Sequence, residues 1–257
     1  GQLCPQARED VLEVGHRRHS STRARWAACG GSYAPLGILA PMTQLHVRAP
    51  EGAIAPIVLL PGDPDRATLV ADTFLEGAER YNSYRHLYGY TGTYRGTRVS
   101  VQATGMGCPS LAIVVEELVR LGAKTLVRIG TSGVVDAAIE PGDLIVASGS
   151  VANDGTTRQY LGADPYSAVP DFEVTAALAA AARRLRPATH VGLIQTEDAF
   201  YATSPGSVPA LAAKGVLALE MEASALFLLG KLRGVSTGCM LVASNRIGDA
   251  TFVAPEV

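Results

Sequence analysis

The stretch GVLALEMEASALFLLGKLRG, residues 215–234, combines two kinds of secondary structure in one apolar run. Its first eight residues have the length and composition of a buried strand, and the remainder has the composition of a helix that ends at Gly234. Two carboxylates, Glu220 and Glu222, flank Met221 inside this run. Because an unpaired carboxylate is costly to remove from water, either these two lie in a solvated loop or a polar group meets them.

Strands and helices alternate on both sides of this stretch. Strands are predicted over residues 54–62, 97–105, 124–133, 143–152, 190–198, 215–222 and 237–245, and helices over 63–75, 109–122, 173–185 and 223–234. The first helix has Asp63 as its cap and Pro64 as its first residue. This alternation predicts an α/β fold with a mainly parallel sheet covered by helices.

Residues 1–41 differ from the rest of the chain. They contain five arginines, no lysine and no sustained periodicity, and they lack the apolar core of a secretory signal. Glu9, Asp10 and Glu13 also disfavour a transit peptide. We expect this segment to be a disordered or non-native leader, with the natural chain beginning at Met42.

Composition narrows the classes of function. The net charge of −2 does not favour nucleic-acid binding, and no apolar run reaches the roughly 18 residues needed to span a bilayer. Four cysteines at irregular spacing predict a reducing, cytoplasmic setting. The pair His16 and His19 is weak evidence for a metal, so no metal site is expected.

The two carboxylates lie where an α/β sheet would bind a ligand. Residues two apart share a face of a strand but not of a helix, which places Glu220 and Glu222 together at a strand end. A helix that begins there brings amide donors and a positive dipole end. Ligands of open α/β sheets bind beyond the carboxyl ends of strands, although a solvated strand end remains the alternative.

Arginines stand at two other strand ends. Arg66 follows the strand that ends in LLPG, and Arg128 lies inside LVRIG, directly before the turn at residues 130–133. Because arginine is rarely buried unpaired, Arg128 requires an anion, either a phosphate or a buried Asp or Glu. The Gly-Thr-Ser-Gly turn offers amides and hydroxyls to a phosphate, but it matches neither the Walker nor the dinucleotide glycine pattern.

Seven motifs connect these features to a known family. They are LLPGDPDR (59–66), YRHLYGYTGTYRG (84–96), TGMGCPSLAIVVEEL (104–118), RIGTSG (128–133), EDAFY (197–201), EMEASAL (220–226) and VASNRIGD (242–249). Together they resemble the nucleoside phosphorylase-I family, specifically its bacterial hexameric-type purine nucleoside phosphorylases, over residues 42–257. The resemblance implies a single domain with a mixed, mainly parallel central sheet, distorted toward a barrel and flanked by helices.

The resemblance also implies an activity and a phosphate site. Inorganic phosphate, a co-substrate rather than a cofactor, attacks the anomeric carbon of a purine ribonucleoside or deoxyribonucleoside, which gives the free base and a pentose 1-phosphate. The residues that match the family's phosphate ligands are the Gly62 amide, Arg66, Arg128, Thr131 and Arg85, the last donated by a neighbouring subunit. Cations around a dianion suit this chemistry, because charge-assisted hydrogen bonds are strong and fix the nucleophile in line.

The nucleoside site is assigned from the same resemblance. Glu222 matches the carboxylate that accepts both ribose hydroxyls and stabilises a cation-like sugar. Phe200 matches the aromatic that stacks on the base, and His46 matches the histidine that reaches the 5′-hydroxyl from the adjacent subunit. The whole set is His46, Phe200, Glu220, Met221, Glu222, Ser244 and Asn245, with Asn245, Glu222 and Arg128 as the catalytic members.

One position departs from the family pattern. Ser244 is followed by Asn245, where many members have an aspartate that donates a proton to the departing ring. An amide donates a hydrogen bond but is no acid, so we expect a preference for 6-oxopurines such as inosine and guanosine over adenosine.

Other functions stay open at this stage. Uridine phosphorylases share the framework, but the loop after Phe200 lacks their Gln-x-Arg pair. A nucleosidase would use water and has no need of Arg66, Arg85 and Arg128, and a non-catalytic nucleoside sensor has no need of Glu222 either.

The resemblance carries two expectations about the chain as a whole. Because His46 and Arg85 would act across an interface, it implies a hexamer built as a trimer of dimers. Family members continue beyond the APEV at residues 254–257 into a C-terminal helix, so the expected domain lacks that helix.

Overall fold

The computed structural model describes residues 44–186 and 188–248. The strands are β1 (Ile57–Leu60), β2 (Glu76–Asn82), β3 (Gly89–Tyr94), β4 (Thr97–Gln102), β5 (Thr125–Val134), β6 (Leu144–Asn153), β7 (Thr189–Glu197), β8 (Val216–Glu220) and β9 (Ser236–Arg246). The helices are α1 (Pro64–Phe74), α2 (Cys108–Arg120), α3 (Gly155–Leu161), α4 (Phe172–Leu185), α5 (Val208–Ala212) and α6 (Ala223–Arg233), with short 3-10 turns η2 (Tyr84–His86) and η3 (Pro205–Ser207). The expected leader over residues 1–41 and the question of a C-terminal helix lie outside the described residues.

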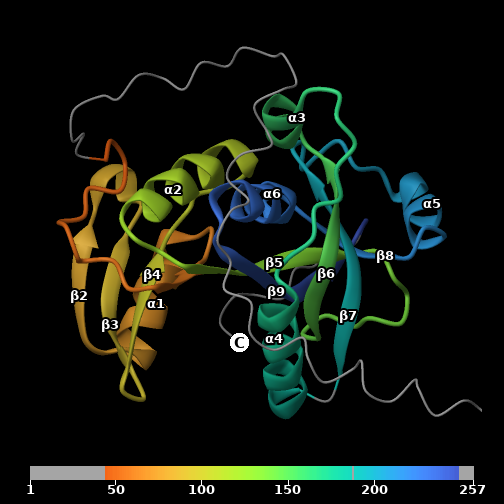
Figure 1. Cartoon of the computed structure of the whole chain (residues 1–257). Coiled ribbons are helices and arrows are strands. Elements are labelled where there is room, and N and C mark those ends of the chain that lie inside the picture. The colour runs from red at the N-terminus through yellow and green to blue at the C-terminus, as the bar shows by residue number, and fades with distance from the viewer. Residues whose placement is uncertain (1–43, 187, 249–257) are drawn as a thin grey trace, which may run out of the picture. The chain divides into compact units, whose positions relative to one another are not determined.

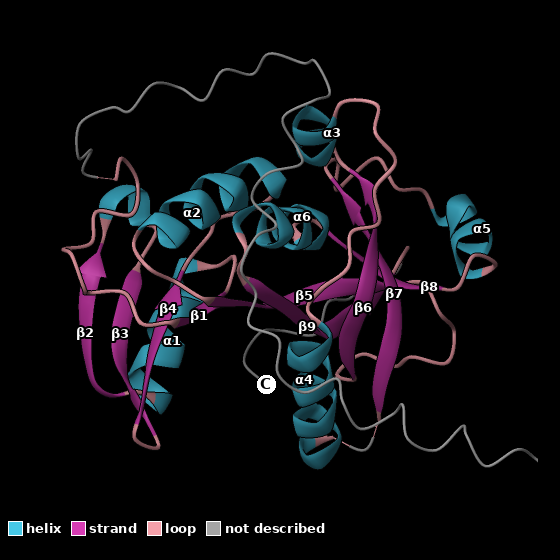
Figure 2. Ribbon diagram, in the orientation of Figure 1, coloured by secondary structure: helices cyan, strands magenta, loops and turns pink. Residues whose placement is uncertain are grey.

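The strands form one mixed sheet that closes on itself at one end. Its order is β2-β3-β4-β1-β5-β8-β7-β6-β9, and an additional pairing joins β9 back to β5. The ring β5-β8-β7-β6-β9 is completed by two antiparallel contacts, β5 with β8 and β6 with β9, while β5 and β9 run parallel. The expectation of an α/β domain with a mixed, barrel-like sheet is therefore confirmed for the described residues (Figures 1 and 2).

The sequence patterns predicted the buried elements but not the edge of the sheet. The sequence patterns predicted neither the strands β2 and β3 nor the helices α3 and α5. β2 has the sequence EGAERYN and is largely exposed, so it lacks the apolar alternation that marks a half-buried strand. β2 pairs with the glycine-containing β3 because the two strands lie next to each other in the sheet, and its own composition does not specify this pairing.

Helix α6 is the centre of the core. All eight residues from Ala223 to Gly230 are buried, which explains why this segment is apolar on every side and not amphipathic. It packs with α2 over β5 and β9, while α4 covers the opposite face (Figure 1). Gly234 ends the helix in the left-handed conformation with φ of 68°, as its glycine predicted.

Several strand ends meet at one edge of the closed sheet. In the parallel pair β1–β5, Leu60 lies opposite Arg128, so the Pro61–Gly62 turn follows beside residues 129 and 130. In the β5–β9 pair the register shifts after Ser132, which leaves Ser244 as the extra residue of a β-bulge and pairs Gly133 with Asn245. Bulges next to sites re-aim side chains, and this one lies where the candidate residues converge.

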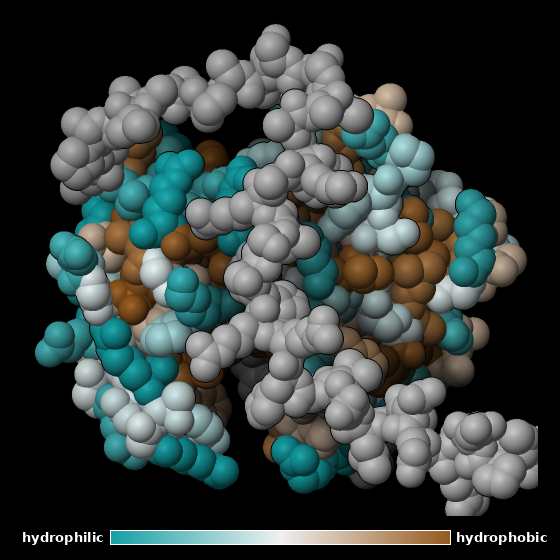
Figure 3. Space-filling view, in the orientation of Figure 1, coloured by the Kyte–Doolittle hydropathy of each residue, from teal (hydrophilic) through white to brown (hydrophobic). Residues whose placement is uncertain are grey.

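Two further observations concern membrane-spanning helices and the exposed surface. No helix of the described residues is long and apolar enough to cross a membrane. Hydrophobic residues reach the surface over β6 and β7 (Figure 3), where Val151 and Val191 are both 39% exposed. Isolated exposure of this size is ordinary for a folded protein.

Replacing Phe227 tests the central position of α6. The Phe227 side chain is fully buried in the main core cluster, so we expect Phe227→Ala to lower the free energy of unfolding by about 3–5 kcal/mol. Leu232→Ala, on the 45% exposed side of the same helix, is the matched control and should cost much less. Urea denaturation of both variants measures the difference, and equal losses would contradict this description of α6.

Candidate functional site

A buried arginine lies between the two carboxylates that stood out in the sequence. Arg128 Nε is 2.8 Å from Glu220 Oε2, and Arg128 Nη2 is 2.5 Å from Glu222 Oε2. All three residues are at most 5% exposed. The sequence left open whether Arg128 pairs with a phosphate or with buried carboxylates, and in the described chain it pairs with two carboxylates. Arg128 is also the polar group that these buried carboxylates require.

The charges of this cluster perturb one another. Burial alone would lower the pKa of Arg128, but the attraction of Glu222 and Glu220 raises it, so the guanidinium stays charged. Burial raises the pKa of Glu222 above its ordinary value, and repulsion from Glu220 adds to this, while Arg128 and the amides of Gly107 and Met221 oppose it. Glu222 therefore takes up a proton at a higher pH than an exposed glutamate does.

Glu220 ends β8 and caps the helix that follows. Its carboxylate accepts the backbone N–H of Glu222 at 2.8 Å and that of Ala223 at 3.0 Å. It also accepts the Thr196 hydroxyl at 2.5 Å and Arg128 Nε. Glu222 occupies the cap position of α6 without a side-chain cap bond, and Glu220 receives the amides of the helix start.

Glu222 is held by a glycine loop. The Gly107 N–H donates to Glu222 Oε1 at 2.5 Å, and Gly107 has a φ of 87° that a side chain would strain. A carboxylate offers about four acceptor positions, and in Glu222 the Gly107 amide meets Oε1, Arg128 meets Oε2, and the Met221 amide also stabilises the charge. The carboxylate is therefore held on both oxygens and keeps acceptor capacity for a ligand hydroxyl.

The residues expected to bind phosphate lie on adjoining segments. Gly62 follows β1 beside β5, and its carbonyl accepts the Gly105 N–H at 2.9 Å. Arg66 is in the first turn of α1, half-buried, and Thr131 is exposed on β5. Within the described ranges Arg66 has no ion-pair partner, so its charge is available to a ligand.

Arg85 lies in an exposed turn. It belongs to η2, where Arg85 and His86 have φ values of 55° and 59°, a conformation that non-glycine residues adopt rarely. Such strain occurs most often at functional sites. Among residues 44–186 and 188–248, Arg85 has no carboxylate partner, and its guanidinium lies 6.0 Å from the Tyr84 ring.

The residues expected to meet the nucleoside differ in exposure. Phe200 is 57% exposed and contacts Tyr201 edge to face, with ring centroids 5.1 Å apart. Met221 is half-buried between the two carboxylates. Ser244 Oγ lies 3.0 Å from the Ser132 carbonyl oxygen and 2.8 Å from Asn245 Oδ1, and its one proton serves a single acceptor at a time, while Asn245 Nδ2 donates to the Arg246 carbonyl at 3.0 Å. The bulge thus holds the Asn245 amide beside Ser244 and Arg246.

His46 is bound within its own chain. Its Nδ1 lies 2.9 Å from Glu117 Oε1, and the other oxygen of Glu117 accepts the N–H of His46 at 2.9 Å and of Val47 at 2.6 Å. One carboxylate of α2 therefore orients this segment and the imidazole ring. The second ring nitrogen, Nε2, makes no hydrogen bond to the described residues.

The sequence did not single out Thr196, Gly107 or Glu117. Gly107 and Glu117 lie inside the TGMGCPSLAIVVEEL motif, whose paired glycines signal a backbone that must approach another group closely. Thr196 lies opposite Glu220 in the β7–β8 pair, and no pattern local to β7 reveals that contact.

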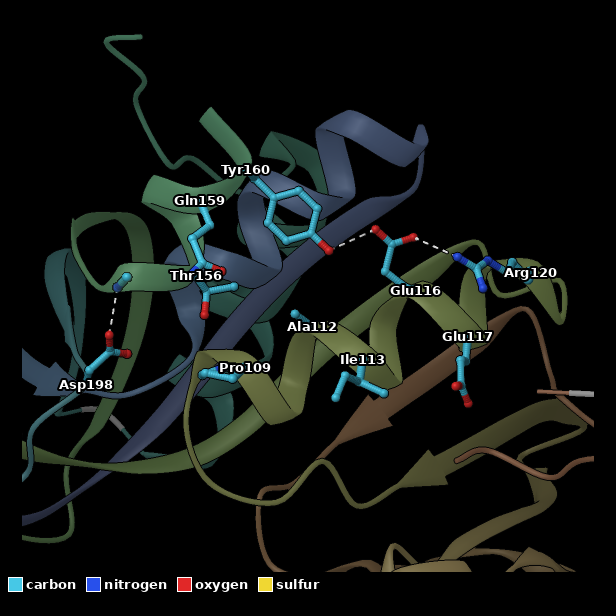
Figure 4. A pocket seen from close by; sticks show the side chains of 11 residues that line it. Pro109, Ala112, Ile113, Glu116, Glu117, Arg120, Thr156, Gln159, Tyr160 and Asp198 are labelled. Atoms are coloured by element: carbon cyan, nitrogen blue, oxygen red, sulfur yellow. Dashed lines mark hydrogen bonds and ion pairs between the residues drawn. The ribbon is translucent and has the colours of Figure 1, made fainter. Parts of the chain in front are cut away.

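A separate cavity of about 560 Å³ lies between α2 and α3 (Figure 4). Its floor is apolar, with Pro109, Ala112 and Ile113 from α2, and its rim carries Glu116 and Tyr160, which hydrogen bond at 3.2 Å. Arg128, Glu220 and Glu222 do not line it. This cavity is therefore distinct from the carboxylate–arginine cluster.

One group of residues has the spacing of a metal site. Cys108, Asp154 and Asp198 each place a ligand atom within 4.8 Å of the others. Both carboxylates already accept backbone N–H groups, Asp154 from Thr157 and Asp198 from Gly155. Burial raises the pKa of the Cys108 thiol, which disfavours the thiolate that a metal would need. The donor set does not argue for a metal.

Comparison with known proteins places the chain among phosphorylases. The sequence profile of a family described as "Phosphorylase superfamily" matches residues 56–255. "Purine nucleoside phosphorylase DeoD-type" of Streptococcus pyogenes serotype M5 (strain Manfredo) is 39% identical over 209 residues, which cover 81% of this chain and 88% of that protein. Proteins of the same description from Clostridium novyi (strain NT) and Lacticaseibacillus casei (strain BL23) are 40% and 43% identical, over 79% of this chain and 87% and 85% of theirs.

Gly130 leaves room for the guanidinium of Arg128. A methyl group built on Gly130 would lie 2.9 Å from Arg128 Nη2 and 3.0 Å from Cζ. Because two carboxylates hold this guanidinium, Gly130→Ala must displace it against its ion pairs, and we expect a loss of about 1–3 kcal/mol in the free energy of unfolding. Gly206→Ala is the matched control, since its methyl group would meet only Ser204 Oγ at 3.7 Å. Urea denaturation compares them, and an unaltered Gly130→Ala protein would argue against a rigidly held Arg128.

Proposed function

The chain belongs to the phosphorylase superfamily, and from that premise we propose that it is a purine nucleoside phosphorylase. Phosphate attacks the anomeric carbon of a purine nucleoside, a new carbon–oxygen bond forms, and the electron pair of the broken glycosidic bond leaves with the base. The observation that carries this proposal is the buried contact between Arg128 and Glu222 at the strand ends. In this proposal the cation binds phosphate directly beside the carboxylate that accepts the sugar hydroxyls.

The phosphate is bound by donors that the ion pairs leave free. Arginine has five N–H donors, and Arg128 uses one for Glu220 and one for Glu222, so three remain. Arg66, the Gly62 amide and the Thr131 hydroxyl supply the other contacts on this side. Held by such charge-assisted bonds, the phosphate is fixed in line with the bond that breaks.

The sugar is bound by Glu222. Its remaining acceptor capacity takes the vicinal hydroxyls, while Gly107 and Arg128 prevent the carboxylate from turning. As the glycosidic bond breaks, positive charge develops on the sugar, and a fixed carboxylate stabilises it.

The base is bound by Phe200, Met221, Ser244 and Asn245. Asn245 donates a hydrogen bond to the departing ring, which stabilises the electron pair that the ring receives. Because an amide cannot transfer a proton as an acid does, this arrangement favours 6-oxopurines, which tolerate a hydrogen-bond donor at N7. Glu220 supports the nucleoside site through its contacts with Arg128 and Glu222.

The complete site needs a second subunit. Arg85 lies in a strained, exposed turn and carries an uncompensated charge among the described residues, which suits a residue donated to a neighbour's phosphate. His46 offers Nε2 to the 5′-hydroxyl of the neighbour's nucleoside, with Glu117 orienting its ring. We infer a hexamer built as a trimer of dimers, acting in the cytoplasm with no cofactor besides the phosphate co-substrate.

A nucleoside panel assayed with and without inorganic phosphate tests the proposal. We expect inosine and guanosine to be cleaved only when phosphate is present, and pentose 1-phosphate to form in a 1:1 ratio with the free base. Cleavage without phosphate would identify a nucleosidase. A preference for uridine would identify a pyrimidine phosphorylase, and binding without turnover would identify a sensor.

The same panel tests the assignment of Asn245. Initial rates on inosine should exceed those on adenosine, and Asn245→Asp should raise the relative rate on adenosine because it restores a group able to donate a proton. An adenosine preference in the unaltered protein would overturn this assignment.

The raised pKa of Glu222 predicts how nucleoside binding depends on pH. The ionised carboxylate accepts both hydroxyls, and burial moves its protonation above the ordinary glutamate range of about 4.3. Nucleoside affinity measured by calorimetry without phosphate should therefore fall as pH decreases, with a midpoint above that range. Glu222→Gln should bind weakly at every pH, and a midpoint in the ordinary range would contradict the buried position of this carboxylate.

A further inference from the structure

The Thr196 hydroxyl lies at the base of the carboxylate–arginine cluster. Thr196 is fully buried near the end of β7, opposite Glu220 in the β7–β8 pair. Its Oγ1 is 2.5 Å from Glu220 Oε1, 2.7 Å from Ser150 Oγ and 3.0 Å from the backbone nitrogen of Ser224. This single oxygen therefore joins β6, β7, β8 and the first turn of α6.

The direction of each hydrogen bond follows from the donors available. An ionised carboxylate only accepts, so the one hydroxyl proton of Thr196 goes to Glu220. The Ser224 N–H can only donate, and Ser150 must then donate its own proton to Thr196. Thr196 thus has its donor and both acceptor positions occupied, which fixes its hydroxyl in one orientation.

Glu220 is saturated by the same network. One oxygen accepts Thr196 and Ala223, and the other accepts Arg128, Glu222 and a second, shared contact from Ala223. The side chain has no exposed surface. No acceptor position is left for a substrate, so what Glu220 contributes to the reaction passes through the groups it holds.

We propose, on the basis of the phosphorylase function above, that Thr196 is a positioning residue whose hydroxyl sets the Glu220 carboxylate, which in turn aims Arg128 at the phosphate. Thr196 is not a catalytic residue, because it touches neither the substrate nor the reacting atoms. Glu222 has its own anchor in the Gly107 amide, so it depends less on this hydroxyl. Thr196 therefore acts mainly on phosphate and only slightly on the nucleoside.

Thr196→Val removes the hydroxyl but keeps the shape of the side chain, so it should change the two KM values to different extents. The substitution leaves Glu220 Oε1 with the Ala223 amide as its remaining donor, leaves the Ser224 N–H without its acceptor, and leaves Ser150 with only the Val151 carbonyl at 3.5 Å. We expect KM for phosphate to rise about tenfold, the scale of one hydrogen bond to a charged group. KM for inosine should change less than threefold, a split that general destabilisation would not produce.

Two further variants distinguish a positioning role of the Thr196 hydroxyl from a general effect on protein stability. Thr196→Ser keeps the hydroxyl and should restore KM for phosphate to within about twofold of the unaltered protein. Thr237→Val is the matched control, because Thr237 is 2% exposed and has no side-chain hydrogen bond within the described residues. It should leave both KM values unchanged. Each variant is assayed as the full chain, with its folding checked by thermal denaturation.

The outcomes distinguish this inference from the proposed function. If the unaltered protein shows no phosphate-dependent cleavage, the proposed function fails. If it does, and Thr196→Val is folded with an unchanged KM for phosphate, or if KM for phosphate and inosine rise equally, the positioning role of Thr196 is overturned. Failure of Thr196→Ser to restore phosphate KM would also overturn it.

Discussion

One buried guanidinium between two carboxylates is the constraint on which the rest of this structure depends. Burying three charged groups is costly, and removing one partner leaves an uncompensated charge. Arg128 and its two glutamates are accordingly held from several directions, by the start of α6, the Gly107 loop and the Thr196 hydroxyl. A group fixed in this way can serve substrate without reorganising, which is the property that electrostatic catalysis requires.

The fold supplies the geometry that this cluster needs. β5 carries Arg128, and β8 ends in Glu220 where α6 begins, so the ion pairs join the sheet to its central helix. The β-bulge at Ser244 brings Asn245 opposite Gly133 on the same strand β5. The long parallel pair of β5 and β9 therefore brings Arg128 and Asn245 toward one edge of a closed sheet.

The sequence predicted the buried elements well because their signals are local. Apolar strands, the cap at Asp63 and the helix end at Gly234 were all found where expected. The edge strands β2 and β3 were not, because their residues are exposed and their pairing is specified by neighbours. The candidate site could also be predicted only in part. The charged residues Arg128, Glu220 and Glu222 stood out in apolar segments of the sequence, whereas their hydrogen-bond partners did not.

By itself, the sequence determined an α/β chain, a set of charged residues at strand ends and, through its motifs, a family. Composition and spacing carry that information, because burial and turn formation act on neighbouring residues. Only the tertiary structure decided that Arg128 pairs with both carboxylates, that Glu220 and not Glu222 caps α6, and that Thr196 completes the cluster. These contacts join residues from 2 to 94 positions apart in the chain across strand pairs whose register no local pattern records, and in a buried site it is the hydrogen-bond partner that fixes the role of a charge.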